Sequence, residues 1–317
     1  MNPVLKVRDV CLSYHTLSGE TPALSHISFD LMPGEFLSIV GPSGCGKSTL
    51  LNLIAGLLTP EHGSITLGGR PVSSGSAAVG YMLQKDHLLE WRSIYKNILL
   101  GLEIRKELTP EKLAHAEALL QTYGLDRFRD ARPSQLSGGM RQRIVIAIAL
   151  ASNPEILICD EPTTALDVTI QAQIIALMEE LREKLGMSII IITHDLGVVA
   201  DMADEIIVMY AGEIVERGTA RDIFYHQQHP YTWALLQSVP RIDDEDKTIL
   251  NTIEGNIPDM IYPPKGCSFC TRCPYAMKIC EEEKPKVTHI TDEHSVACWL
   301  MDPRADRSGV PFGRTDA

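Results

Sequence analysis

Two kinds of hydrophobic pattern follow one another along this chain and predict strands that alternate with helices. Residues 5–14 alternate apolar and polar side chains, which predicts a strand with one exposed face. Short continuous apolar runs predict strands buried on both faces, at 36–40, 156–159 and 188–193. Apolar residues at helical spacing predict helices, at 48–58, 141–151 and 171–184. Such alternation predicts an α/β fold around a largely parallel sheet.

Other patterns predict what surrounds this core. A helical pattern from Trp91 to about Asp130, continued by 141–151, predicts a helical subdomain over about 91–152. Apolar runs on both sides of Ala211-Gly212 predict a hairpin, and Gly19–Pro22 reads as a turn. After about residue 240 the chain becomes charged and then proline-rich. We therefore divide it into a first domain, 1–235, and a C-terminal extension, 236–317, in which 301–317 lacks periodicity and predicts a loose tail.

Composition and charge narrow the function. The 317 residues include 41 acidic and 29 basic side chains, a net charge of −12 that argues against nucleic acid as a partner. Hydrophobic residues make up 44%, which excludes disorder as the main state. No apolar run approaches the roughly 20 residues that span a bilayer, and no signal peptide is visible at the N-terminus. We expect a cytoplasmic protein whose 8 cysteines are not paired as structural disulfides.

A glycine-rich loop between a predicted strand and a predicted helix carries the first chemical motif. Gly41-Pro-Ser-Gly-Cys-Gly46-Lys47-Ser48 fits G-x-x-x-x-G-K-[ST]. Its backbone N–H groups can wrap phosphates, Lys47 adds a positive charge, and the Ser48 hydroxyl can bind Mg²⁺. A chance glycine-rich turn is the alternative, and the flanking strand and helix argue against it. The predicted phosphate-binding residues are Gly41, Pro42, Ser43, Gly44, Cys45, Gly46, Lys47, Ser48 and Thr49.

A pair of carboxylates follows the apolar run at 156–159. Asp160 ends this predicted strand, where it can hold the Mg²⁺ shell, and Glu161 comes next, where it can orient or deprotonate a water molecule. Taken alone, the pair reads better as an acidic strand end that caps a helix. Together with the phosphate-binding loop it predicts a nucleoside triphosphate hydrolase that uses Mg²⁺.

Leu136-Ser-Gly-Gly-Met140 supplies a second anion-binding helix start. One chain does not need two γ-phosphate sites for one nucleotide, whereas two chains arranged head to tail do. With this motif the sequence resembles the ATP-binding subunits of ABC transporters. The resemblance implies a P-loop NTPase (RecA-like) core with an antiparallel β part, an inserted helical signature subdomain and a second ATPase subunit, identical or different. It places phosphate contacts on Ser137, Gly138 and Gly139.

The same resemblance assigns roles to four isolated residues. Gln84 matches the family's Q-loop glutamine, and His194 matches the switch histidine. Asp167 matches the family's loop between the two sites, and Tyr14 matches the aromatic residue that stacks on adenine. Each of them, taken alone, reads better as an ordinary surface or core residue. The implied catalytic set is Lys47, Gln84, Glu161 and His194, with Ser48, Gln84 and Asp160 around Mg²⁺.

The two halves resemble different importer branches. Tyr210-Ala-Gly-Glu-Ile-Val-Glu-Arg-Gly and His229-Pro-Tyr-Thr resemble dipeptide and oligopeptide importers, whereas Val79 to Arg92 is closer to nitrate, sulfonate and taurine importers. The resemblance implies transmembrane permease subunits, an extracytoplasmic solute-binding protein and a location on the inner face of the membrane. Peptide import is the favoured function. A nitrate- or taurine-type importer and a soluble non-transport ATPase are the alternatives. Leu88, Leu89 and Trp91 are either docking residues for the permease or core.

Five cysteines crowd the end of the chain, at positions 267, 270, 273, 280 and 298. Thiols at this density in a cytoplasmic chain favour a metal centre over disulfides. The peptide-importer resemblance implies a [4Fe–4S] cluster on Cys267, Cys273, Cys280 and Cys298; Cys270 departs from the family pattern and is an alternative ligand. Zinc in a closed thiolate site is the second reading, and free thiols are the third.

Overall fold

The fold is built on one long mixed sheet. The computed structural model describes residues 2–16, 19–72, 78–164, 167–238, 253 and 255–313. In these residues an eight-stranded sheet has the order β11-β12-β10-β9-β3-β8-β7-β6. Its five parallel strands are β3 (Phe36–Val40), β6 (Val79–Met82), β7 (Ile156–Asp160), β8 (Ser188–Ile192) and β9 (Glu205–Tyr210). The antiparallel strands are β10 (Glu213–Thr219), β11 (Val287–His289) and β12 (Ser295–Ala297).

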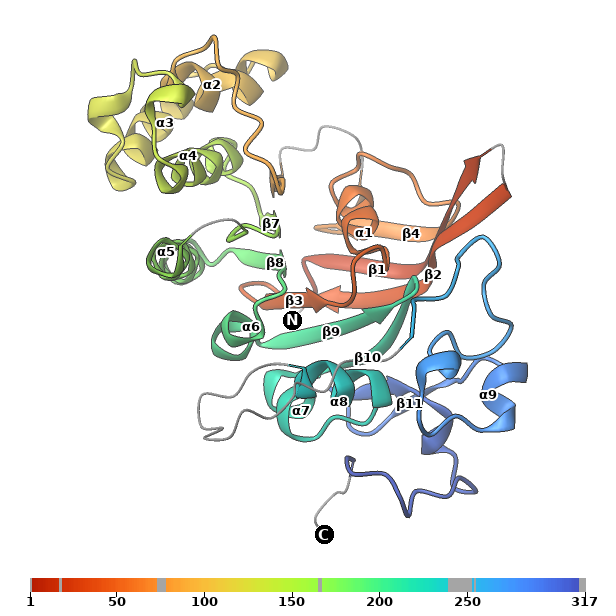
Figure 1. Cartoon of the computed structure of the whole chain (residues 1–317). Helices are drawn as coiled ribbons and strands as arrows, with labels where there is room; N and C mark the ends of the chain where they lie inside the picture. The colour runs from red at the N-terminus through yellow and green to blue at the C-terminus, as the bar shows by residue number, and fades with distance from the viewer. Residues whose placement is uncertain are drawn as a thin grey trace.

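A second, antiparallel sheet lies beside it (Figure 1). Its order is β2-β1-β4-β5, formed by β1 (Leu5–Thr16), β2 (Gly19–Leu31), β4 (His62–Leu67) and β5 (Arg70–Pro71). The turn expected at Gly19–Pro22 is wrong, because these residues begin β2, where Pro22 lies opposite Ser13. Proline lacks a backbone N–H, and β2 is an edge strand that tolerates this loss.

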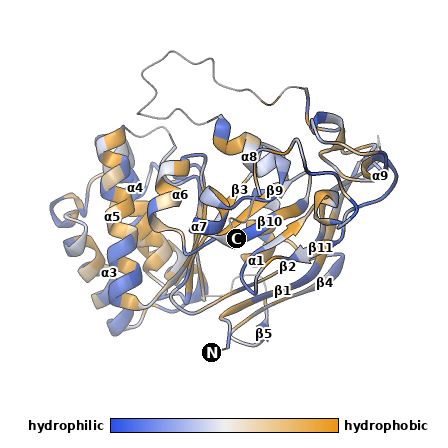
Figure 2. Ribbon diagram, turned by 90° about the horizontal axis from the view of Figure 1, so that it is seen from below, coloured by the Kyte–Doolittle hydropathy of each residue, from blue (hydrophilic) through white to orange (hydrophobic). Residues whose placement is uncertain are grey.

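Alternate residues of the parallel strands point into two separate cores. In β3, Leu37 and Ile39 face the core that holds α1 (Lys47–Ile54) and the antiparallel sheet. Phe36 and Val40 face the core that holds the helices α4 (Gly138–Leu150), α5 (Val168–Leu185) and α6 (Leu196–Met202). A strand buried on both faces favours apolar side chains on both sides, which explains why the runs are almost continuously apolar, with Ser38 as the buried polar residue of β3. In Figure 2 the central strands β3 and β9 are mostly hydrophobic, while α5 carries both colours.

Three helices project from the core as a group (Figure 1): α2 (Ile94–Arg105), α3 (Pro110–Thr122) and α4 (Gly138–Leu150). Each begins at a hydroxyl cap, because Ser93, Thr109 and Ser137 accept a hydrogen bond from a backbone N–H in the first turn. Helix α4 therefore starts three residues before the expected 141. Helix α1 ends before the expected 58, since Gly56 adopts the left-handed conformation that terminates helices.

Several helices connect and flank these strands. Helix α5 (Val168–Leu185) starts at the Asp167 cap and packs on the sheet face that carries α6. The shorter helices are α6 (Leu196–Met202), α7 (Ala220–Tyr225), α8 (Pro230–Gln237), α9 (Lys278–Glu282), and single turns at Asp126–Phe128, Pro133–Gln135, Cys270–Arg272 and Trp299–Met301. Among the described helices none combines the length and the apolar character needed to span a bilayer.

The C-terminal extension is attached to the main sheet. Its hairpin β11–β12 pairs with β10, at Glu216 opposite Val296 and Arg217 opposite Ser295. The end of the chain differs from the loose tail expected at 301–317. Val310 and Phe312 are buried with Leu300 in a small core, and the Phe312 ring stacks on Trp233 with centroids 5.7 Å apart. Residues 314–317 lie outside the described part of the chain.

Candidate functional site

The glycine-rich loop joins β3 to α1 and has no room for side chains at two positions. A Cβ on Gly41 would lie 2.3 Å from the carbonyl oxygen of Met209, and a Cβ on Gly46 would lie 2.5 Å from that of Ala23. Gly46 also has φ 102°, a left-handed conformation that other residues rarely adopt. These glycines let the loop turn tightly, so that its N–H groups and the start of α1 face one point.

The Lys47 side chain folds into this loop. Its ammonium donates hydrogen bonds to the carbonyl oxygens of Gly41, at 2.8 Å, and Pro42, at 2.9 Å. The side chain is buried, so its position is set by packing as well as by these bonds. Lys47 therefore places a positive charge inside the loop, where the phosphates of a bound nucleotide would lie.

Asp160 at the end of β7 reaches across to the start of α1. Its carboxylate accepts a hydrogen bond from Ser48, and burial raises the pKa of Asp160 while this hydrogen bond lowers it. A hydroxyl and a carboxylate in contact offer the hard oxygen ligands that Mg²⁺ prefers, and a bound cation would offset the cost of burying the carboxylate. The residues present therefore fit a magnesium ion, which Ser48 and Asp160 would hold.

The Glu161 carboxylate contacts two other predicted catalytic residues, Gln84 and His194. It accepts hydrogen bonds from the Gln84 amide, at 2.8 Å, and the Thr164 hydroxyl, at 3.1 Å. His194 Nε2 lies 2.6 Å from Glu161 Oε1. Glu161 has φ 50°, an uncommon conformation for a residue with a side chain, costing about 1–3 kcal/mol. This backbone turn directs the carboxylate from the strand end toward Gln84 and His194.

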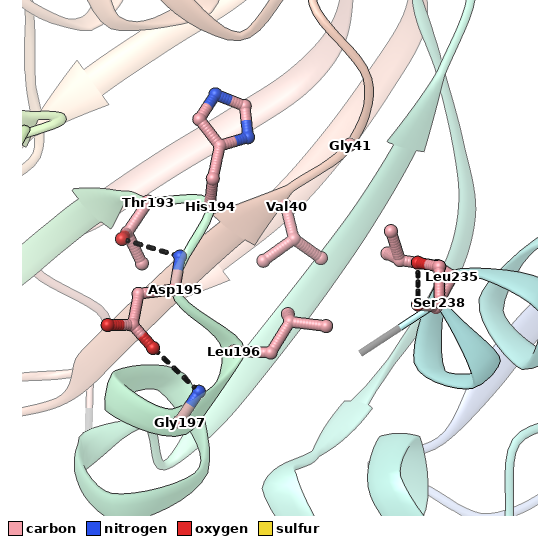
Figure 3. Close-up of a pocket in the computed structure, with 9 residues that line it drawn as sticks. All are labelled: Val40, Gly41, Thr193, His194, Asp195, Leu196, Gly197, Leu235 and Ser238. Carbon is pink, nitrogen blue, oxygen red and sulfur yellow. Dashed lines mark hydrogen bonds between the residues drawn. The ribbon is translucent and has the colours of Figure 1, made fainter. Parts of the chain in front are cut away.

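His194 follows β8 and is held by the turn that starts α6. The Asp195 N–H donates to the Thr193 hydroxyl, and the Asp195 carboxylate accepts from Gly197 N–H at 3.0 Å. Figure 3 shows the His194 ring turned away from this capped helix start. The His194 side chain is 56% exposed, whereas Glu161 is 15% exposed, so the histidine is free to contact a ligand while the carboxylate is sheltered.

A pocket of about 320 Å³ gathers these residues at one place. Tyr14 lies at its rim, 44% exposed, with its hydroxyl 3.2 Å from the Thr49 hydroxyl. Sequence reasoning missed several lining residues because none of them belongs to a motif. Most notable is Met260, which comes from the C-terminal extension. The pocket is lined by Tyr14, Thr21, Pro22, Ala23, Ser43, Gly44, Gly46, Lys47, Ser48, Thr49, Gln84, Asp160, Glu161, His194 and Met260.

The predicted signature residues lie elsewhere. Ser137, Gly138 and Gly139 are not among the described residues that line this pocket. Ser137 and Gly138 are exposed at the start of α4, and a Cβ on Gly139 would meet Ile170 at 2.8 Å. Asp167 is exposed and accepts a hydrogen bond from Ile170 N–H at 3.0 Å, while Ala165 and Leu166 fall outside the described residues. The fold thus separates the second anion-binding motif from the first.

The cysteines of the C-terminal extension lie near one another. Burial, reinforced by neighbouring thiols, raises the pKa of Cys267 and Cys298 to about 12 and that of Cys273 to about 11. The thiols that raise the pKa of Cys298 are those of Cys267, Cys273 and Cys280. Together with Cys298 these are the four predicted ligands, and Cys270 is not among them. Within the described residues, however, no group of three or more His, Cys, Asp or Glu is arranged to hold a metal ion. The predicted metal centre stays a prediction.

Solved structures of ATP-binding cassettes share this fold. One is a dimeric cassette in a post-hydrolysis state bound to ADP and Pi; it is 32% identical, with a TM-score of 0.62, covering 68% of this chain and 99% of that chain. Another is cbiO1 from Clostridium perfringens, part of the cbiONQ transporter complex, 30% identical with a TM-score of 0.62, covering 71% of this chain and 91% of that chain.

Sequence comparisons cover almost the whole chain. The ABC transporter family model matches residues 24–164, and the model of the oligopeptide/dipeptide transporter C-terminal region matches 215–280. The dipeptide transport ATP-binding protein DppD of Bacillus subtilis is 43% identical over 97% of this chain and 98% of its own length. The oligopeptide transport ATP-binding protein OppD of the same organism is 42% identical over 97% and 92%. The chain belongs to the ABC transporter ATP-binding family, in the branch that carries the oligopeptide/dipeptide transporter C-terminal region.

Proposed function

We propose that this protein hydrolyses ATP to drive the import of dipeptides or oligopeptides through separate membrane subunits. The observation that carries the ATPase function is the position of Glu161, in contact with Gln84 and His194 and lining one pocket with Lys47. The peptide substrate is supported by the match to the oligopeptide/dipeptide C-terminal region and by relatives named for dipeptide and oligopeptide transport. Those relatives align through both halves of the chain, which disfavours a nitrate- or taurine-type importer.

Each site residue has one task in the reaction. Lys47 and the loop amides bind the β- and γ-phosphates, and Ser48 and Asp160 would hold Mg²⁺, which neutralises phosphate charge when it is bound. Glu161 accepts a proton from a water molecule while the oxygen of that water attacks the γ-phosphorus. The bond between the γ-phosphorus and the β–γ bridging oxygen breaks, which gives ADP and phosphate. Gln84 holds the Glu161 carboxylate in place, and the exposed His194 contacts the γ-phosphate.

The exposed signature implies that the working unit is a pair of ATPase subunits. Ser137 to Gly139 of one subunit would close on the nucleotide held by Lys47 of the other. Asp167 would connect the two sites, and the neighbouring Val168 is 80% exposed, as expected of a residue that a partner covers. The second subunit is either identical or a related ATP-binding chain.

The helical subdomain supplies the surface for the membrane subunits. Trp91 is 70% exposed at its edge, whereas Leu88 is buried in the main core. Of the candidate docking residues, Trp91 therefore fits a permease contact and Leu88 serves packing. We propose that residues 1–235 form the ATPase unit and 236–317 an attached module. The pair of ATPases would sit on the inner face of the membrane, and the permease would receive peptide from an extracytoplasmic binding protein.

Substituting Ser137 by arginine tests both the paired site and the transport function. In proteoliposomes that contain the permease subunits, the binding protein and the second ATPase, we expect Ser137→Arg to reduce ATP-driven uptake of a labelled dipeptide at least about 100-fold, the effect of losing one anion-stabilising donor and blocking its site. ATP binding by the isolated subunit should be unchanged, because Ser137 lies outside the pocket of its own chain.

Ser134→Arg is the matched control, because Ser134 is also exposed and precedes α4 in the same segment. It should transport like the wild-type protein. Equal loss of ATP affinity in isolated Ser137→Arg would show that the signature acts within its own chain. Uptake of labelled taurine in place of dipeptide would overturn the peptide assignment.

We also propose that Cys267, Cys273, Cys280 and Cys298 hold a [4Fe–4S] cluster, with zinc as the second candidate and Cys270 as the alternative ligand. Support comes from their proximity: the Cys267 N–H donates to the Cys280 carbonyl at 2.8 Å, and Cys267, Cys273 and Cys280 add to the effect of burial in raising the pKa of Cys298. Cys280 is buried and the other three cysteines are half-buried, so as thiolates they need a cation to offset the loss of solvent, and soft iron or zinc is the cation that sulfur binds best. The centre would hold together a segment too small to build a large core of its own.

Metal analysis of protein purified without oxygen tests this proposal. We expect a brown protein with broad absorption in the visible range and roughly four irons per chain. Cys280→Ser should lose the colour and the iron, while Cys11→Ser, on β1 and remote from the extension in sequence, should keep both. Colourless protein with one zinc would replace the cluster by a structural zinc site. Metal-free, folded protein with freely titratable thiols would exclude both.

A further inference from the structure

We propose that Met260 of the C-terminal extension is part of the ATP site and packs against the nucleobase. The inference rests on ATP binding at the pocket already described, and adds a binding residue from outside the ATPase core. Met260 lines that pocket together with Tyr14 and the start of β2. The extension would thereby contribute directly to nucleotide affinity.

Met260 lies on the side of the pocket that the antiparallel sheet lines. Met260 and Pro22 both line the nucleotide pocket and also a neighbouring hollow of about 330 Å³ that reaches the extension at Lys265 and Ser268. The next residue, Ile261, has Cγ2 3.7 Å from where a Cβ on Gly19 would lie. The segment around Met260 therefore runs beside the first residues of β2.

The pocket has two sides: one carries the groups that would react with the phosphates, and the other carries Tyr14 and Met260. Of the reacting groups, Asp160 ends strand β7, Glu161 follows it, and His194 comes after β8 of the central sheet. Tyr14 stands on β1 in the other sheet, over the first turn of α1, with its hydroxyl 3.2 Å from Thr49. A nucleotide whose phosphates lie in the loop directs its base away from the reacting groups and toward Tyr14. Met260 lies on that side.

The extension holds Met260 in place through a turn and two anchors. The Asp259 carboxylate accepts a hydrogen bond from Ile261 N–H at 2.9 Å, and the Asp259 carbonyl accepts one from Tyr262 N–H at 3.1 Å. Arg272 donates to the Ile253 carbonyl at 2.7 Å and to the Tyr210 hydroxyl at 3.2 Å, which ties the extension to β9 on both sides of the turn. Met260 itself is half-buried against the main core.

The chemistry of the side chain suits a flat, uncharged ligand group. A methionine thioether is flexible and polarizable, and it makes favourable contacts with aromatic rings. It carries no charge or strong hydrogen-bond donor, so it offers nothing to phosphate. Its contribution should therefore depend on the base, whereas that of Lys47 should depend on the phosphates.

Nucleotide affinity of the full chain tests this difference. We expect Met260→Ala to weaken binding of Mg-ATP about 3- to 10-fold, the effect of removing a side chain of this size from one apolar contact. Binding of Mg-tripolyphosphate, which has neither base nor sugar, should not change. Met260→Leu keeps the apolar volume and should bind ATP within about 2-fold of the wild type.

Two further variants separate this inference from the ATPase function itself. Ile257→Ala, in the same segment but outside the pocket and 38% exposed, should bind both ligands normally. Lys47→Ala should lose both ligands; if it does not, the pocket is not the phosphate site and the ATPase assignment fails. If Met260→Ala binds ATP normally while Lys47→Ala binds neither ligand, only the proposed role of Met260 is overturned.

Oxidation of the unmodified protein gives a second test that does not depend on a folded variant. Dilute hydrogen peroxide converts accessible methionine to its sulfoxide, which mass spectrometry locates. We expect Mg-ATP to protect Met260 and Mg-tripolyphosphate to leave it reactive. Met277 and Met301, which pack in the small C-terminal core, should react equally in both. Equal protection of Met260 by the two ligands, or by neither, would contradict contact with the base.

Discussion

Replacing Glu161 by glutamine should reduce ATP turnover at least about 100-fold, the lower range for the loss of a general base. Glutamine keeps the shape of the side chain but cannot accept the proton of the attacking water. Its amide also presents a donor where the carboxylate now accepts from Gln84 and Thr164. Phosphate release in the assembled transporter measures the effect. ATP binding should persist, so that the variant holds ATP in a stable dimer.

Glu155→Gln provides the matched control. Glu155 immediately precedes β7, the strand that Glu161 follows, and it is exposed. The same change of charge at this position should leave turnover near the wild-type rate. Turnover by Glu161→Gln close to that of Glu155→Gln would refute the assigned role, and loss of ATP binding would show that Glu161 acts in binding rather than in the chemical step.

Removing His294 should lower the free energy of unfolding by about 3 kcal/mol or more, because it deprives a buried carboxylate of a partner. Glu216 on β10 is completely buried and lies 2.9 Å from His294 Nε2. The same carboxylate accepts hydrogen bonds from the backbone N–H groups of Gln228, at 2.5 Å, and His229, at 3.1 Å. In His294→Leu this carboxylate would remain buried with only its backbone donors.

Chemical denaturation of the full chain measures this loss. His289→Leu, on the same hairpin but exposed, should change stability by no more than about 0.5 kcal/mol. Adding Glu216→Gln to His294→Leu should recover part of the loss, since the double variant no longer buries a carboxylate. A His294→Leu protein as stable as His289→Leu would show that Glu216 is satisfied without the histidine.

The extension is joined to the ATPase core by more than this pair. Phe269, between Cys267 and Cys270, is buried among the rings of Tyr210 and Tyr231, with centroids 5.2 and 5.4 Å away. His229 accepts a hydrogen bond from Tyr231 N–H on its ring, and burial lowers the pKa of His229 to about 3, which keeps this acceptor neutral. The cysteine segment is thereby fixed to the end of β9 and to α8.

Much of the nucleotide site followed from local sequence. The loop at 41–48 could be recognised because its glycines, Lys47 and Ser48 act within one short segment. The carboxylate pair Asp160 and Glu161 also followed, since it ends an apolar run that predicts a buried strand, whereas His194 was expected from the family resemblance. The expected positions of Tyr14 and Gln84 came from the family resemblance, as isolated residues carry no local signal.

Long-range packing decided the rest. Residues Gly19–Pro22 begin strand β2 although their local sequence predicts a turn. They pair with β1 in an edge strand, where a proline is tolerated because one side of the strand has no partner. The strands β11 and β12 have three residues each and show no periodicity long enough to read, yet they extend the main sheet from β10.

The hydrophobic pattern and the short motifs by themselves specified an α/β core, a phosphate-binding loop and a carboxylate pair, because those features depend on residues close in sequence or on strand ends that any parallel sheet brings together. The burial of Glu216 against His294, 78 residues away, and the arrival of Met260 beside the start of β2 depend on how distant segments pack. Such contacts are chosen by shape and burial across the whole chain, and only the tertiary structure reveals them.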